Sequence, residues 1–154
     1  MIRPHPPDRP SRGRGYAQDV SRFPLRTGRW TFLLRLLAPG DLVAEVGPET
    51  VRVRMGWLGG AEVPVALVER ISRMSWPWWG GVGVRLGRGL VAFVAAAGDA
   101  AVLELGEEVA VRTPLRWRTR RVVIAAEDVV GLIEAVAAAR RAAWTGVSPP
   151  AASP

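Results

Sequence analysis

Few residues of this 154-residue chain have side chains that could act as nucleophiles, acids or bases. Cysteine is absent, and the single histidine, His5, lies in a segment rich in proline and arginine. These facts exclude a disulfide scaffold, a thiolate zinc site, a cysteine nucleophile and histidine-based catalysis in the folded part. Ser72 and Ser75 have neither a histidine nor a lysine in the chain's folded part to activate them. We therefore expect no catalytic residues.

The sequence also contains no convincing motif for a metal or a cofactor. The acidic pairs Glu107-Glu108 and Glu127-Asp128 fall at a predicted turn and at a predicted helix start, and no acidic cluster is spaced for a carboxylate metal site. Residues 87–92 read GRGLVA, which has the form G-x-G-x-x-A. A dinucleotide fingerprint must open a helix, whereas this one leads into a strand-like run. We expect a glycine-rich turn, no cofactor, no metal and no enzymatic activity.

The positive charge is concentrated near the start of the chain. All 21 basic residues are arginines; residues 1–30 carry a net charge of +5, and residues 31–154 carry only +2. A nearly neutral folded part disfavours nucleic acid as a partner. The proline-rich and arginine-rich residues 1–28 are predicted to be a disordered leader, and residues 144–154 a disordered tail. The leader is either simply solvated or a tether for anionic lipid or an acidic partner.

Arginines in the folded part form two candidate anion-binding groups. Arg52 and Arg54 alternate along a predicted strand, so both face the same side, where guanidinium groups could hold a phosphorylated headgroup. Arg116, Arg118 and Arg120 belong to the densest basic cluster, which surrounds a tryptophan. That cluster could contact a phosphate backbone, or it could be the solvated face of an edge strand.

Three tryptophans within four positions, Trp76, Trp78 and Trp79, form the most unusual local feature. They cannot all face inward from one strand, so at least one is expected to be exposed. Exposed tryptophan is typical of partner surfaces and membrane interfaces. The alternative is that the three rings pack over the open end of the fold and against the helix. This segment is the candidate partner surface.

The elements that position these residues are mostly short strands. Val51, Val53 and Met55 alternate with polar residues, and a turn signal before them predicts a hairpin with residues 42–46. Further strands are expected at 62–66, 71–76, 90–96, 101–105, 109–113 and 118–124. The turn signal Gly98-Asp99 predicts that residues 90–96 and 101–105 pair as a hairpin. Residues 127–141 have helical periodicity, with acids at the start and arginines at the end.

Several of these stretches together resemble a known family. The run VRVRMGW at residues 51–57, the glycine-rich residues 81–91, the apolar residues 122–124 and the pair Glu127-Asp128 occur in the order seen in bacterial domains with a pleckstrin-homology-like (PH-like) fold and no established function. The resemblance covers roughly residues 30–140. It implies a mainly β (α+β) fold, a PH-like bent antiparallel barrel of about seven strands capped by one C-terminal α-helix, within residues 29–143. Residues 92–97 depart from the family in being very alanine-rich.

The sequence thus predicts a non-enzymatic PH-like binding or scaffold module in the cytoplasm. Its first expected role is protein–protein interaction, including self-association, through the tryptophan segment at residues 76–79 or an exposed barrel edge. The alternative is peripheral binding to anionic lipid at the inner membrane face, through arginines and exposed tryptophan. No transmembrane segment is expected, because Gly98 and Asp99 interrupt the longest apolar run.

Overall fold

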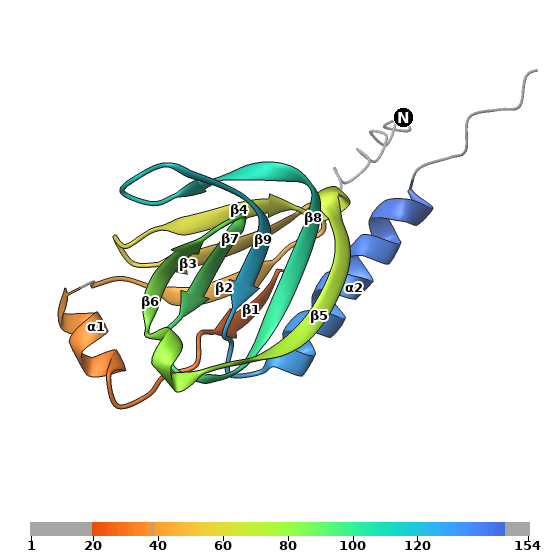
Figure 1. Cartoon of the computed structure of the whole chain (residues 1–154). Coiled ribbons are helices and arrows are strands. Elements are labelled where there is room, and N and C mark those ends of the chain that lie inside the picture. Colours follow the sequence, from red (N-terminus) through yellow and green to blue (C-terminus); the bar gives the residue numbers. More distant parts are fainter. Residues whose placement is uncertain (1–19, 38, 147–154) are drawn as a thin grey trace, which may run out of the picture.

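The fold is mainly β in the structure, a computed structural model that describes residues 20–37 and 39–146. Nine strands form one mixed sheet, and two α-helices and two short 3₁₀ helices accompany it (Figure 1). The strands are β1 (Ser21–Pro24), β2 (Leu42–Val46), β3 (Thr50–Met55), β4 (Gly60–Pro64), β5 (Val68–Trp76), β6 (Gly83–Gly87), β7 (Leu90–Val94), β8 (Gly98–Arg112) and β9 (Trp117–Ile124). The helices are α1 (Thr31–Leu37), η1 (Val65–Leu67), η2 (Trp78–Gly80) and α2 (Val129–Thr145).

The sheet is open rather than barrel-shaped. Its strand order is β1-β2-β3-β4-β8-β9-β7-β6, and β5 pairs with the first part of the long strand β8. Among the described strands, β1 and β6 end this order and do not pair with each other. The expected barrel of about seven antiparallel strands is therefore wrong in strand number and in closure. It is also wrong in direction at one place, because β7 and β9 run parallel.

The hairpin expected from residues 42–57 is confirmed. Strand β3 pairs antiparallel with β2, and its residues alternate between buried and exposed. Val51, Val53 and Met55 face the core, whereas Arg52 and Arg54 face outward. The sequence showed this alternation of apolar and polar residues because only one face of β3 is covered by the core.

The hairpin expected between residues 90–96 and 101–105 is wrong. Strand β9 lies between β7 and β8 and pairs with both. Its apolar residues Val122, Val123 and Ile124 are fully buried, so they need neighbours on both sides and on both faces. The true hairpin joins β6 to β7, with Gly89 in the left-handed region at φ +66°. This is the glycine-rich turn expected at residues 87–92.

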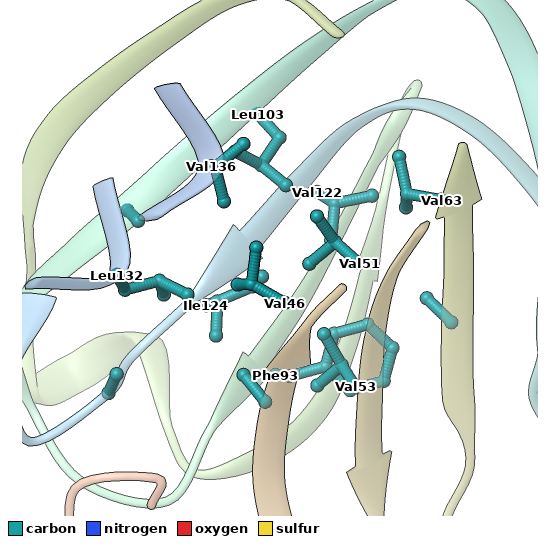
Figure 2. Packing of buried hydrophobic residues seen from close by; sticks show 14 of the residues in the cluster. Val46, Val51, Val53, Val63, Phe93, Leu103, Val122, Ile124, Leu132 and Val136 are labelled. Atoms are coloured by element: carbon teal, nitrogen blue, oxygen red, sulfur yellow. The ribbon is translucent and has the colours of Figure 1, made fainter. Parts of the chain in front are cut away.

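The core lies between the sheet and α2. Leu132 and Val136 of α2 are fully buried, and in Figure 2 they lie beside core residues from several strands, among them Val46, Leu103 and Ile124. The helix begins after Asp128, whose carboxylate accepts a hydrogen bond of 2.8 Å from the N–H of Gly131. A Cβ at Gly131 would lie 2.1 Å from Asp128 Oδ2, so this close approach explains a glycine inside the helix. The expected C-terminal helix is confirmed.

The fold extends beyond the expected boundaries of the domain at both ends. Strand β1 pairs with β2, and Leu25 next to it is only 1% exposed, so residues 20–28 belong to the fold rather than to the leader. At the other end α2 continues to Thr145, beyond the expected boundary at residue 143. The apolar side chains of Phe23 and Leu25 provide the burial that the arginine-rich and proline-rich composition obscured. Residues 1–19, including His5, and 147–154 lie outside the described residues.

Candidate functional site

Helix α1 presents apolar side chains to solvent. Trp30 just before it and Phe32 and Leu36 within it are 65%, 74% and 70% exposed, and Leu33 is also exposed. The helix is attached by its other side, where Thr31 is buried and Leu34 packs on the core. The Thr31 hydroxyl accepts a hydrogen bond of 2.6 Å from the N–H of Gly28 and donates one of 3.4 Å to the carbonyl oxygen of Ala95. Apart from Leu34, the described apolar side chains from Trp30 to Leu36 thus remain in water.

The tryptophan segment divides into a packed ring and two displayed rings. Trp76 is half-buried against a second apolar cluster of small residues from β7, β8 and β9, and its Nε1–H donates to the carbonyl oxygen of Gly81 at 3.1 Å. Trp78 and Trp79, in η2, are 83% and 75% exposed. The prediction that at least one of the three is exposed is confirmed.

Helix α1 and η2 lie at the same end of the sheet, at the lower left of Figure 1. The segment leading into α1 contacts the β7–β8 connection, because a Cβ at Gly28 would lie 3.0 Å from the Cβ of Ala96. Trp76, just before η2, is the register partner of Gly98 at the end of that connection. We call six exposed apolar residues in or directly next to α1 and η2 the aromatic end; they are Trp30, Phe32, Leu33, Leu36, Trp78 and Trp79.

Arginines border the aromatic end. Arg29, Arg35 and Arg85 form no ion pair within the described part of the chain. The carboxylate of Asp99 is bound by Arg73, and this hydrogen bond, opposed by partial desolvation and helped by the charges of Arg73 and Arg26, lowers the pKa of Asp99. Asp99 is therefore charged at neutral pH and paired, so it does little to offset the remaining cations.

The candidate anion-binding arginines are spread over the sheet and partly neutralised. Arg52 lies 3.2 Å from Glu62, Arg54 lies 2.9 Å from Glu45, and Arg118 lies 3.7 Å from Glu108. Arg116 and Arg120 are exposed and form no ion pair in the described ranges. Strands β4 and β8 separate the pair on β3 from the three near β9, so the five do not converge on one point. Arg52 and Arg54 instead line a shallow depression of about 610 Å³ that also contains Trp57, Glu62 and Arg112.

An apolar groove is the feature that sequence reasoning missed. One wall consists of five consecutive residues, 82–86, which include most of β6. The remaining lining residues are Leu34 from α1, Leu58 from the β3–β4 connection, and Pro114 and Leu115 from the β8–β9 connection. Its volume is about 300 Å³. Four segments far apart in the sequence form it, so no local pattern could have revealed it.

Neither metal binding nor membrane spanning has support in the described residues. They contain no group of three or more His, Cys, Asp or Glu side chains that could hold a metal ion. None of the helices in residues 20–37 and 39–146 is both long and apolar enough to cross a membrane. No family model matches the chain, and no curated protein or solved structure matches it significantly. The function must therefore be argued from the surface itself.

Proposed function

We propose that this protein is a non-enzymatic binding module that docks peripherally on anionic membranes through the aromatic end. The observation that carries the proposal is the outward orientation of α1. A helix with Trp, Phe and Leu on its solvent side and arginines beside them matches the composition of helices that lie in the membrane interface. Trp78 and Trp79 at the same end add two rings that favour the headgroup level.

Apolar burial and charge both contribute to such docking. Complete burial of a Phe or Leu side chain provides about 1.5–3 kcal/mol, and a basic residue near an anionic surface about 1 kcal/mol. The first 30 residues carry a net charge of +5. Stable peripheral binding requires two signals of this kind, one apolar and one electrostatic. The aromatic end supplies the first, and the bordering and leading arginines supply the second.

A PH-like relationship and a cytoplasmic location at the inner membrane face are part of the proposal. The C-terminal helix packed on a sheet of mostly antiparallel strands supports the relationship. The open sheet and the parallel pair β7–β9 are departures from what the resemblance implies. The absence of enzymatic activity rests on the sequence, where histidine occurs only at His5 and cysteine and lysine are missing.

Co-sedimentation of the full chain with vesicles tests the docking proposal. We expect binding to phosphatidylglycerol-containing vesicles and little binding to neutral ones. The double substitution Phe32→Ser and Leu36→Ser should weaken binding at least about tenfold, because two anchors are lost. Trp30→Ala and Trp144→Ala form a matched pair, since both rings are exposed but only the first belongs to the aromatic end. Equal pelleting of these two variants, or no pelleting of the full chain, would contradict the proposal.

The role of the leader is tested by charge removal rather than by truncation. A chain starting at residue 29 would lose β1, which belongs to the sheet. The substitutions Arg3→Ser, Arg9→Ser, Arg12→Ser and Arg14→Ser keep the full chain and remove four charges. We expect weaker binding at low salt and little difference at high salt, because exposed charges are screened there. Unchanged binding at low salt would show that the leader is only solvated.

Protein–protein interaction, including self-association, remains a second candidate function. The observation that favours it is the exposure of Trp78 and Trp79 beside Gly80-Gly81, since tryptophan is enriched at the centre of interfaces. Sedimentation velocity of the full chain tests self-association. If it occurs through these rings, Trp78→Ala and Trp79→Ala should shift the distribution toward monomer without lowering the melting temperature.

A further inference from the structure

The apolar groove runs along the open edge of the sheet. Strand β6 ends the strand order and pairs only with β7 among the described strands. Residues that line a face of a strand alternate, whereas the groove is lined by the consecutive residues 82–86. It therefore follows the edge of β6, where main-chain groups as well as side chains are accessible.

The hairpin geometry defines which main-chain groups point into this groove. Arg88 and Gly89 form a two-residue turn, and Gly87 is the register partner of Leu90. The residues flanking such a turn exchange hydrogen bonds, and bonded and non-bonded pairs then alternate along the ladder. The N–H and C=O groups of Val84 and Leu86 consequently point away from β7, toward the groove. Neither residue makes a main-chain hydrogen bond to a further element in the part of the chain that the structure describes.

We propose that this edge accepts an extended peptide segment of a partner protein, with alternating apolar and acidic residues, as an additional strand beside β6. On the inner side of the sheet, Val84 and Leu86 pair with the core residues Phe93 and Val91, so an added apolar side chain would meet Leu58 or Leu115 across the groove. On the outer side, the added residues would lie beside Arg85. Main-chain bonds would give affinity, and the alternate side chains specificity.

Charge favours an acidic occupant. No carboxylate lines the groove in the described residues. Arg85 lines it, Arg116 directly follows Leu115, and Arg88 lies two residues after Leu86; none of these three arginines forms an ion pair with a described residue. A second copy is disfavoured, because antiparallel pairing of two β6 strands would bring their arginines together. A lipid surface is disfavoured too, since open sheet edges do not occur within the hydrocarbon region.

Fluorescence anisotropy without lipid tests the proposal independently of membrane docking. The probe is a labelled, acetylated seven-residue peptide of alternating valine and glutamate, and the control peptide has lysine in place of glutamate. We expect the glutamate peptide to bind the full chain and the lysine peptide to bind at least about tenfold more weakly. Arg85→Glu should reverse this preference. No binding of the glutamate peptide at millimolar concentration, or equal binding of both, would overturn the proposal.

Two substitutions at one position test the strand geometry. Leu86→Ala and Leu86→Pro both shorten the side chain, but only proline removes the N–H group that points outward from β6. An edge strand tolerates proline at such a position. We expect proline to weaken binding about tenfold more than alanine, since one main-chain hydrogen bond is lost. Equal loss in both variants would overturn strand addition. If Leu86→Pro does not fold, the proposal is decided by whether Arg85→Glu reverses the preference between the two peptides. If the full chain self-associates and Leu86→Ala abolishes this, the occupant of the groove is a second copy, and the proposal of an acidic partner is overturned.

Discussion

The two α-helices use similar residues for opposite purposes. Helix α2 buries Val129, Leu132 and Val136 against the sheet and exposes Glu134 and Arg141. Helix α1 buries Thr31 and leaves Phe32 and Leu36 in water. The buried apolar residues of α2 therefore contribute to the stability of the fold, whereas Phe32 and Leu36 of α1 contribute little to it. The exposed apolar side chains of α1 are the basis of the proposed docking surface.

The largest difference between the helices should appear in stability. Leu132→Ala leaves a cavity in the core and should reduce the free energy of unfolding by about 2–5 kcal/mol. Leu36→Ala removes the same atoms from a surface position and should change it by less than about 0.5 kcal/mol. Urea unfolding measures both. A large loss for Leu36→Ala would mean that α1 is covered within the molecule, and the proposed docking surface would then fail.

Buried and exposed side chains also differ within the tryptophan segment, where we expect a stability difference of intermediate size. Trp76→Ala removes a half-buried ring and the hydrogen bond to Gly81, and we expect a loss of about 2 kcal/mol. Trp78→Ala should be neutral in thermal unfolding because its ring is exposed. Similar melting temperatures for the two variants would contradict the division into one packed and two displayed rings.

The start of α2 offers a smaller test. Asp128→Ala removes the acceptor for the N–H of Gly131 and should cost about 1 kcal/mol in the free energy of unfolding. Asp128→Asn keeps a hydrogen-bond acceptor and should recover most of that loss. Because α2 is part of the core and α1 is not, we expect vesicle binding per folded molecule to be the same in both variants. Reduced vesicle binding by the folded Asp128→Ala variant would contradict this expectation and show that the start of α2 affects docking through α1.

The smallest expected effect concerns pH at the exposed pair of Arg73 and Asp99. The pKa of Asp99 is lowered, so the carboxylate stabilises the folded state above its ordinary pKa. This contribution is lost as the pH falls through the lowered pKa. Asp99→Asn should slightly reduce the melting temperature at neutral pH, and the difference from the unsubstituted chain should vanish in acid. A difference that grows in acid would have the wrong sign for this pair.

Local patterns in the sequence correctly predicted the features that depend on residues close together in the sequence. The β2–β3 hairpin followed from alternation at Val51 and Val53, and α2 from helical spacing and its acidic start. The predicted β7–β8 hairpin was wrong because a turn signal at Gly98 does not reveal that a later strand, which begins at Trp117, inserts between β7 and β8. Helix α1 was missed because its displayed apolar side gives no buried-face periodicity.

The candidate site was predicted in part for the same reason. Exposure near Trp78 followed from the crowding of three rings in four positions. The contacts that form the groove beside β6 depend on which segments of the chain become neighbours. These contacts are set by the strand order, which the sequence pattern alone did not reveal.

The central position of β9 has a consequence for how the chain reaches its native state. Strands β7 and β8 are synthesised before β9. Strand β7 also pairs with β6, and β8 with β4 and β5, but one edge of each strand is paired only by β9. Until residues 117–124 emerge, the apolar residues of both strands have unpaired edges, which are templates for association with other chains. Non-local pairing of this kind slows folding. A chain that ends before Trp117 would therefore keep both edges open to other chains, whereas β9 pairs both of them at the centre of the sheet.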